Sequence, residues 1–294
     1  MEAWIEAVRQ AIANATGEEF APARSSGVGG GSISQGFSLA GTDGRRFFVK
    51  KNDARRRAMF EAEAAGLEEL AQCDTLRIPQ VIALVDHGDA CFLVLEHLDL
   101  GGRADGAALG RGVAALHAIT GPTFGWNRDN FIGSTPQPNP PGTDWVAFYR
   151  EHRLAFQRRL ARDNGAGKAL LDAVARLEAD LEALLGDHRP KPSLLHGDLW
   201  SGNWGFVGNG APTLFDPAVY YGDREADIAM MELFGHPGRD FFAAYTEVQP
   251  LDAGYPMRRE LYNLYHILNH FNLFGGGYAS QAERMARRLL SELH

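Results

Sequence analysis

This sequence has few cysteines, no long apolar run and no excess of positive charge. Its 294 residues include only two cysteines, which excludes a disulfide-stapled scaffold. No stretch approaches the roughly 18 consecutive apolar residues that a transmembrane helix needs. The formal net charge is −8, which argues against a nucleic-acid binder, because such proteins carry a basic excess or a basic stripe.

The amino-terminal segment also lacks the apolar core of a signal peptide. Its first ten residues, MEAWIEAVRQ, are charged and amphipathic. With 45% hydrophobic and 22% charged residues, the chain has the composition of an ordinary globular protein that buries a sizeable core. We therefore expect a cytoplasmic protein that binds neither nucleic acid nor membrane. The sequence does not fix the oligomeric state, and a monomer is favoured.

The order of the predicted elements indicates two unequal lobes. A helix over 2–14 precedes several strands, and a second helix, over 54–72, lies among them. The later helices are predicted over 107–119, 144–162, 166–185, 225–234, 238–246, 256–274 and 279–293. We expect an α+β fold with a small β-rich lobe, 1–98, for nucleotide binding. The larger, mainly helical lobe, 99–294, would carry the catalytic loop and the substrate groove.

Two segments interrupt this helical pattern. Residues 121–143 form a long Gly/Pro/Asn-rich connection, and connections of that length are more often functional than idle. Short apolar runs near residues 194, 205 and 214 predict a small β patch, with Asn209-Gly210 as a hairpin signal between the last two. The polar residues beside this patch are the candidates for chemistry.

A polar motif at 193–206, SLLHGDLWSGNWGF, follows one of these apolar runs. It contains the pattern H-x-D-x₄-N at His196, Asp198 and Asn203, and Asp216 follows thirteen residues after the asparagine. Phosphoryl transfer from ATP needs a carboxylate that takes the hydroxyl proton and oxygen ligands for Mg²⁺. We therefore predict Asp198 as the base and Asn203 and Asp216 as metal ligands. The alternative is a polar turn whose side chains cap backbone groups.

Lys50 ends the predicted strand RRFFVK, and the adjacent Lys51 is its rival. Alternation puts Lys50 on one face and Lys51 on the other, so the period separates the two lysines without choosing between them. In the helix over 54–72, Glu63 lies within the apolar stripe, where an unpaired carboxylate is costly. An ion pair with Lys50 would satisfy both groups and hold the lysine toward the phosphates. Alternatively, Glu63 lies at the edge of the stripe and reaches water.

The densest glycine cluster, GVGGGSIS, covers residues 27–34. It lacks the Gly-Lys-Ser/Thr of a Walker A loop, and a serine replaces the third glycine of G-x-G-x-x-G. Its backbone N–H groups could still hold phosphate oxygens, with a flexible linker as the alternative. The residues that we expect at the phosphates are Gly30, Gly31, Ser32, Ile33 and Ser34.

Together, several segments resemble the fructosamine-3-kinase, or ketosamine-3-kinase, family over about residues 14–290: HGDLWSGN, DPAVYYGDRE, GGGSIS, FFVK, MFEAEAAGL and LNHFNLFG. The Leu-Trp after Asp198 separates this family from aminoglycoside phosphotransferases and choline kinases, which share the wider H-x-D-x₄-N plan. The resemblance implies a protein-kinase-like fold that uses ATP and Mg²⁺ to phosphorylate the sugar O3 of ketosamines, small molecules or glycated protein lysines. The 3-phosphate then decomposes and regenerates the amine.

The resemblance also implies roles for particular residues. Asp198 accepts the proton of the O3 hydroxyl, Asn203 and Asp216 bind Mg²⁺, and Lys50, oriented by Glu63, holds the ATP phosphates in preference to Lys51.

Further positions follow from the same resemblance. Backbone groups at Glu96, His97 and Leu98 are expected to meet the adenine. For the substrate, Trp200 is expected beside the sugar, and Trp145 and His152 are expected to line or brace the groove. Some relatives carry cysteine where this chain has Ser32, so no redox control through that loop is expected here.

Other functions use a similar plan. A kinase for an aminoglycoside, choline or a free sugar would share the motif. A nucleotide-binding pseudokinase would lack the base, a metal ligand or the lysine, all of which are present. A protein kinase would need an activation segment that ends in A-P-E, whereas the chain enters a predicted helix, READIAMMELFG, eight residues after Asp216. A small substrate is therefore favoured.

Overall fold

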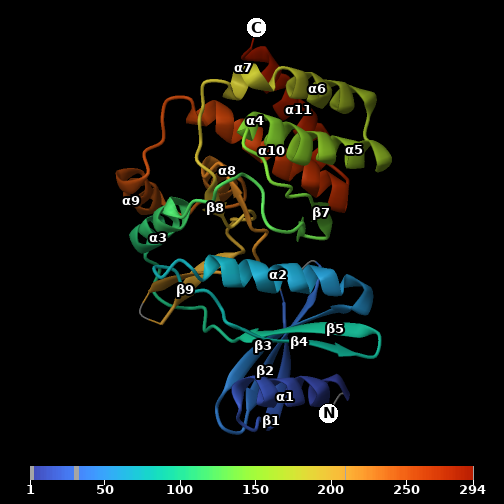
Figure 1. The fold of residues 1–294 in the computed structure, drawn as a ribbon, viewed down its shortest axis with the longest axis vertical. Helices are drawn as coiled ribbons and strands as arrows, with labels where there is room; N and C mark the ends of the chain where they lie inside the picture. Colours follow the sequence, from blue (N-terminus) through green and yellow to red (C-terminus); the bar gives the residue numbers. More distant parts are fainter. Residues whose placement is uncertain (1–2, 30–32, 209, 294) are drawn as a thin grey trace.

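The computed structural model describes residues 3–29, 33–208 and 210–293, so Gly30, Gly31 and Ser32 lie outside the described residues, as does Asn209. The first part of the chain forms an antiparallel sheet of five strands in the order β1-β2-β3-β5-β4 (Figure 1). These strands are β1 (Pro22–Val28), β2 (Gln35–Gly41), β3 (Arg46–Asp53), β4 (Val81–His87) and β5 (Ala90–Glu96).

Two helices cover opposite faces of this sheet: α1 (Ala3–Thr16) and α2 (Arg57–Leu70) (Figure 1). The apolar run of β5 explains the arrangement, because successive side chains of a strand point to opposite faces. Phe92 and Val94 join the cluster built on α1, whereas Leu93 and Leu95 join the cluster that contains α2. Both faces of the sheet are therefore buried, and the α2 face is the one that meets the rest of the molecule.

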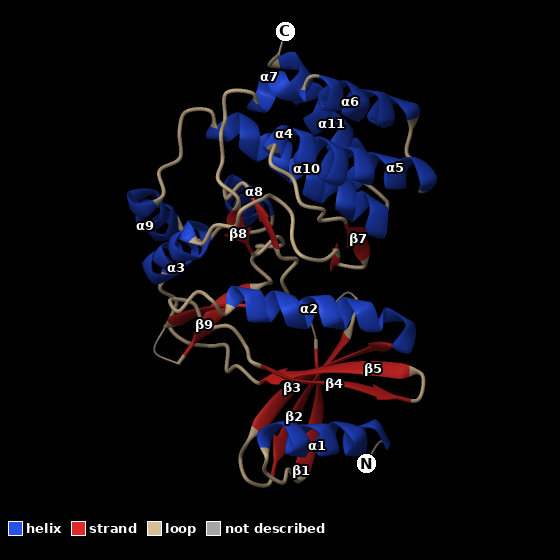
Figure 2. Cartoon of the chain, in the orientation of Figure 1, coloured by secondary structure: helices blue, strands red, loops and turns tan. Residues whose placement is uncertain are grey.

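The remaining chain is mainly helical, as Figure 2 shows in blue. Its helices are α3 (Gly106–Ala118), α4 (Trp145–Tyr149), α5 (Phe156–Asp163), α6 (Lys168–Ala179), α7 (Leu181–Leu185), α8 (Glu225–Leu233), α9 (Arg239–Val248), α10 (Tyr255–Phe274) and α11 (Tyr278–Ser291). A π-helical turn, Arg150–Ala155, joins α4 to α5, so the helix predicted over 144–162 is continuous but locally widened. None of the helices described here is both long and apolar enough to cross a membrane.

Three two-stranded pairs lie within this helical part. They are β6 (Asn130–Ile132) with β7 (Thr135–Gln137), β8 (Ser193–Leu195) with β11 (Tyr220–Gly222), and β9 (Trp204–Val207) with β10 (Ala211–Leu214). The β patch predicted from the apolar runs corresponds to β8, β9 and β10. The pair β6–β7 lies inside the connection 121–143, where no strand was predicted.

The sheet and the helical part share contacts close to where the chain passes from one to the other. The Arg77 N–H donates to the Pro212 carbonyl (2.8 Å), and the Thr213 hydroxyl donates to the Arg77 carbonyl (2.6 Å). The segment before β4 is therefore hydrogen-bonded to β10, which lies in the chain between Asn203 and Asp216.

Candidate active site

A compact turn after β8 carries three of the predicted site residues, Asp198, Trp200 and Asn203. The Asp198 carbonyl accepts hydrogen bonds from the Trp200 N–H (3.1 Å) and from Asn203 Nδ2 (2.8 Å). The Asn203 N–H donates back to the Trp200 carbonyl (2.9 Å), and Asn203 Nδ2 also lies 3.2 Å from Asp198 Oδ2. These bonds hold the side chains of Asp198 and Asn203 at one point.

Asp227 on α8 anchors the beginning of this turn. Its carboxylate accepts the N–H groups of His196 (2.7 Å) and Gly197 (2.9 Å), and His117 Nε2 lies 3.2 Å from it. Burial would raise the pKa of Asp227, but the hydrogen bond from His117, the neighbouring rings of His117 and His196, and the Gly197 N–H hold it below its usual value.

Sequence reasoning did not single out Asp227. The available signal was a carboxylate inside the predicted helix 225–234 among apolar neighbours, since a buried carboxylate needs partners.

Glycine is required at position 197 of the turn. Gly197 has φ +83°, and a Cβ there would lie 2.0 Å from the Ala218 carbonyl oxygen.

Asp216 lies next to the turn in a strained conformation. Its φ is +57°, and it is the only non-glycine residue with positive φ in the described part of the chain. Such strain persists where the surroundings determine it, and it is common at functional sites. The adjacent Phe215 N–H donates to the Asn203 carbonyl (3.0 Å), which places Asp216 beside Asn203.

Lys50 links the sheet to this site. Its Nζ lies 2.7 Å from Glu63 Oε1 and 2.5 Å from Asp216 Oδ1. The side chains of Lys50 and Glu63 are only 12% and 14% exposed, so the pair is well shielded from water. Burial would lower the pKa of Lys50, but the carboxylates of Asp216 and Glu63 outweigh burial and raise it, so the lysine is charged.

Lys51 points to the opposite face of β3. Its Nζ lies 6.0 Å from the ring centroids of Trp4 and Phe92, beneath α1. Alternation along the strand put the two lysines on opposite faces without showing which one meets the site. In the structure Lys50 meets Glu63 and Asp216, and Lys51 faces away from them.

Two carboxyl groups of the site have raised pKa values. Burial, together with the charge of Asp216, raises the pKa of Asp198 to about 7, although the hydrogen bond from Asn203 opposes the rise. Burial also raises the pKa of Glu63, against the lowering effect of Lys50. A carboxylate with a pKa close to neutral pH is suited to accept a proton.

The donor atoms fit a hard cation such as Mg²⁺, which prefers oxygen ligands. The Asn203 amide nitrogen is engaged with Asp198, so its Oδ1 is the atom that a cation would take. Asp216 adds a carboxylate, of which Lys50 binds Oδ1. Because Asp216 also raises the pKa of Asp198 by repulsion, a cation here would relieve that repulsion.

The remaining nucleotide-site predictions fall at the sheet. Asn52 Nδ2 donates to the Ile33 carbonyl (3.2 Å) and to Ser34 Oγ (2.9 Å), which ties the end of the glycine-rich loop to β3. Glu96 is the last residue of β5, and its side chain pairs with Arg77. Residues 97 and 98 follow it on the connection to the helical part.

One of the residues predicted at the substrate is buried. Trp145 is 4% exposed and donates from Nε1 to the Tyr262 hydroxyl (3.0 Å), so it does not line a groove, and its place in bracing the groove stays a prediction. An aromatic residue at a helix start looks the same in sequence whether it meets core or ligand. His152 is half-buried with its ring 5.3 Å from Phe148, and its place in the groove stays a prediction. Trp200 is half-buried on the turn itself.

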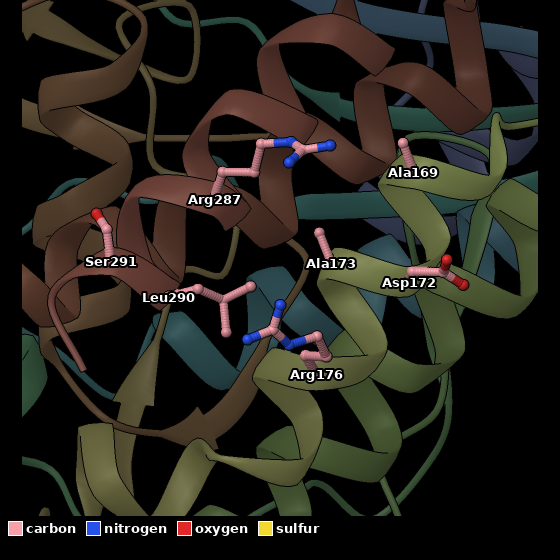
Figure 3. A pocket seen from close by; sticks show the side chains of 7 residues that line it. All are labelled: Ala169, Asp172, Ala173, Arg176, Arg287, Leu290 and Ser291. Carbon is pink, nitrogen blue, oxygen red and sulfur yellow. The ribbon is translucent and has the colours of Figure 1, made fainter. Parts of the chain in front are cut away.

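A surface pocket of about 520 Å³ lies between α6 and α11, where Arg176 and Arg287 flank an apolar floor (Figure 3). These helices are at the end of the helical part that is far from the sheet (Figure 1). None of the predicted site residues lines this pocket.

Comparison with known proteins gives consistent matches along the chain. The fructosamine kinase family matches residues 4–292. A Synechocystis protein with the name "Probable ketoamine kinase" is 46% identical over 97% of this chain and 96% of its own length. A chloroplastic protein-ribulosamine 3-kinase of Arabidopsis thaliana is 44% identical over 87% of this chain and 79% of its own.

Solved structures agree with these matches. A crystal structure from Haemophilus somnus, described as a fructosamine-3-kinase, has a TM-score of 0.88, 30% identity and 97% coverage of both chains. An aminoglycoside phosphotransferase solved with ADP and hygromycin B has a TM-score of 0.62 at 18% identity, over 97% of this chain and 98% of its own, which shows likeness of fold alone. The fold is thus the α+β, protein-kinase-like fold expected from the sequence.

Proposed function

Since the chain belongs to the fructosamine kinase family, we propose that it transfers the γ-phosphoryl group of ATP to the O3 hydroxyl of a ketosamine. The observation that carries the proposal is the meeting of Asp198, Asn203 and Asp216 with the Lys50–Glu63 pair. Phosphoryl transfer needs a proton acceptor, oxygen ligands for a cation and a positive charge at the phosphates, and these residues supply all three.

In this proposal Asp198 is the base. As the O3 oxygen forms its bond to the γ-phosphorus, the bond from phosphorus to the bridging oxygen of ADP breaks, and the O3 proton passes to the Asp198 carboxylate. A pKa of about 7 allows that carboxylate to be ionised at neutral pH and still take the proton. Asp227 supports this role, because it fixes the backbone just before Asp198.

Lys50 and the two oxygen donors act on the phosphates. The charged Nζ of Lys50 would bind phosphate oxygens and stabilise the negative charge that spreads over them during transfer. Glu63 fixes the position of that lysine through the 2.7 Å contact. Asn203 Oδ1 and the Asp216 carboxylate would hold Mg²⁺, which neutralises charge on the β- and γ-phosphate oxygens when bound.

The remaining contacts orient the two substrates. We assign the backbone of Glu96, His97 and Leu98 to the adenine, and the loop that ends at Ile33 and Ser34 to the phosphates. Trp200, two residues from the base, is assigned to the sugar of the ketosamine.

Purified protein with ATP and Mg²⁺ tests the proposal directly. ATP consumption is measured with ribulosamine and fructosamine adducts of lysine, with a glycated protein, and with choline, kanamycin or no acceptor. Turnover on a ketosamine that is lost in Asp198→Asn supports the assignment. Turnover on choline or kanamycin alone would replace the substrate class, and ATP binding without any turnover would indicate a pseudokinase.

A further inference from the structure

The indole of Trp200 lies directly against the backbone of Gly202. A Cβ built on Gly202 would meet Trp200 Cη2 at 2.3 Å, Cζ2 at 2.4 Å and Cζ3 at 2.8 Å. Ordinary contacts between carbon atoms are about 3.5–4.0 Å. The six-membered ring therefore occupies the space that any side chain at position 202 would need.

Ser201 lies between Trp200 and Gly202 and is hydrogen-bonded to the residue that follows α8. Its Oγ donates to the Phe234 carbonyl (2.7 Å), and its N–H donates to the same oxygen (3.3 Å). Gly235, which follows Phe234, has φ +118°, and a Cβ on Gly235 would lie 2.5 Å from Ser201 Cβ. The backbone under the indole is thus held in place, so a clash at position 202 has to be relieved mainly by the indole.

We propose that Gly202 is a positioning residue that sets the orientation of the Trp200 indole, and through it the binding of the ketosamine sugar. This proposal rests on the proposed function and extends it. Side chains occupy discrete rotamers, so the indole displaced by a methyl group at position 202 would move to another rotamer and not by a small shift. The hydrogen bonds between Asn203 and Asp198 do not involve the indole, so the nucleotide and metal contacts are expected to be retained.

Kinetics of Gly202→Ala provide the first test. The KM for a ribulosamine adduct is expected to rise at least tenfold, toward the value of Trp200→Ala, while the KM for ATP stays within twofold. Gly167→Ala is the matched control, because a Cβ at position 167 would meet no atom within 4 Å and this residue lies outside the site. If Gly202→Ala raises both KM values alike, the residue shapes the whole loop and the proposal fails.

The double variant, Gly202→Ala with Trp200→Ala, separates an effect through the indole from any other. If Gly202 acts only by positioning Trp200, adding Gly202→Ala to the variant that lacks the indole changes the ketosamine KM by less than twofold. Full additivity of the two single effects would overturn the proposal.

A spectroscopic arm does not depend on turnover. The chain has five tryptophans, so protein labelled with 5-fluorotryptophan gives five ¹⁹F resonances, and Trp200→Phe identifies one of them. Gly202→Ala is expected to shift the Trp200 resonance and leave the other four in place, whereas Gly167→Ala moves none. An unmoved Trp200 resonance contradicts the contact. If Gly202→Ala shifts the Trp200 resonance, but the wild-type protein binds ATP and phosphorylates no ketosamine, the contact is retained and the proposed function is rejected.

Discussion

Asp198 combines a partly buried carboxyl group with the neighbouring charge of Asp216, and we predict that its replacement separates binding from chemistry. Asp198→Asn keeps the size of the side chain and removes the proton acceptor. Turnover of the ketosamine is expected to fall roughly 10²–10⁴-fold, the usual contribution of a general base. The Kd for ATP, measured by calorimetry, is expected to stay within about threefold, because the phosphate and metal contacts belong to other residues. Near-normal turnover would remove Asp198 from the role of base.

The same residue predicts how stability depends on pH. Burial and the charge of Asp216 raise the pKa of Asp198 from 3.8 to about 7, so between these values the folded protein holds a proton that the unfolded chain has released. The raised pKa favours the folded state at low pH, and this advantage is lost as pH rises through about 7.

Asp198→Asn lacks this ionisation. Without ATP, the variant is expected to be more stable than wild type at pH 8, by roughly 2–4 kcal/mol for a rise of about three pKa units, and to lose the difference toward pH 4. Urea unfolding at several pH values measures it. A difference that does not change with pH would show that burial does not raise this pKa.

Lys50 and Lys51 form a natural pair of test and control. Lys50→Ala removes the cation between Glu63 and Asp216, so the KM for ATP is expected to rise and kcat to fall roughly 10²–10³-fold, the loss typical of a preorganised electrostatic contact. Lys51→Ala removes a cation that faces the rings of Trp4 and Phe92 under α1, and its kcat is expected to stay within about threefold. Reversed effects in steady-state kinetics would overturn the choice of lysine.

Residue types and spacing were enough to find part of the site. That Asp198, Asn203 and Asp216 lie together could be predicted, because each proposed role requires a particular side chain and the three are close in sequence. Asp227 could not, because it acts from a different helix, and sequence shows neither its partners nor which backbone it meets.

At the scale of elements, α2 is attached to the segment that follows Asp216. A Cβ on Gly66 would meet Pro217 Cγ at 3.2 Å and Val219 Cγ2 at 3.3 Å, and the Tyr221 hydroxyl donates to Glu69 Oε1 (2.7 Å). The last turns of the helix that carries Glu63 therefore contact the segment that begins at Asp216. This contact keeps both carboxylates within reach of Lys50.

We predict that enlarging this interface disturbs the ion pair from a distance. Gly66→Val pushes α2 away from Pro217 and Val219, so the KM for ATP is expected to rise about tenfold with a lower kcat, while the KM for the ketosamine stays within twofold. Tyr221→Phe removes one hydrogen bond, worth roughly 0.5–1.5 kcal/mol, and is expected to lower Tm with little effect on KM. Should Gly66→Val lower Tm but leave both KM values unchanged, α2 would not position Glu63.

The elements themselves were predictable where the pattern was long. The apolar stripe of 54–72 predicted α2, because period and length agree there. The three-residue strands β6, β7 and β11 were not predicted, since segments such as Thr135–Gln137 have no alternation to detect and pair only through tertiary contacts. The π-helical turn, Arg150–Ala155, is likewise invisible in sequence, because its residues suit an α-helix equally well.

At the scale of the whole molecule, the sequence predicts two lobes with a boundary near residue 98, but the apolar core does not divide there. One cluster of buried residues contains Phe60 and Leu67 of α2, Leu93 of β5, and Leu214 and Val219 of the helical part. A second, smaller cluster lies between α1 and the other face of the sheet. Removing the helical part would therefore expose the α2 side of the sheet.

This shared core predicts a single cooperative unfolding transition for the full chain. In calorimetry, the calorimetric and van't Hoff enthalpies are expected to agree, and an ATP analogue with Mg²⁺ should raise the temperature of the whole transition. Leu67→Ala lies in the shared cluster and Leu39→Ala in the smaller one. Each leaves a cavity and is expected to lower the free energy of unfolding by roughly 2–5 kcal/mol. Both are expected to shift the same transition. If Leu39→Ala instead splits off an early transition that Leu67→Ala does not, the sheet with α1 unfolds independently, and the boundary near residue 98 separates two cooperative units.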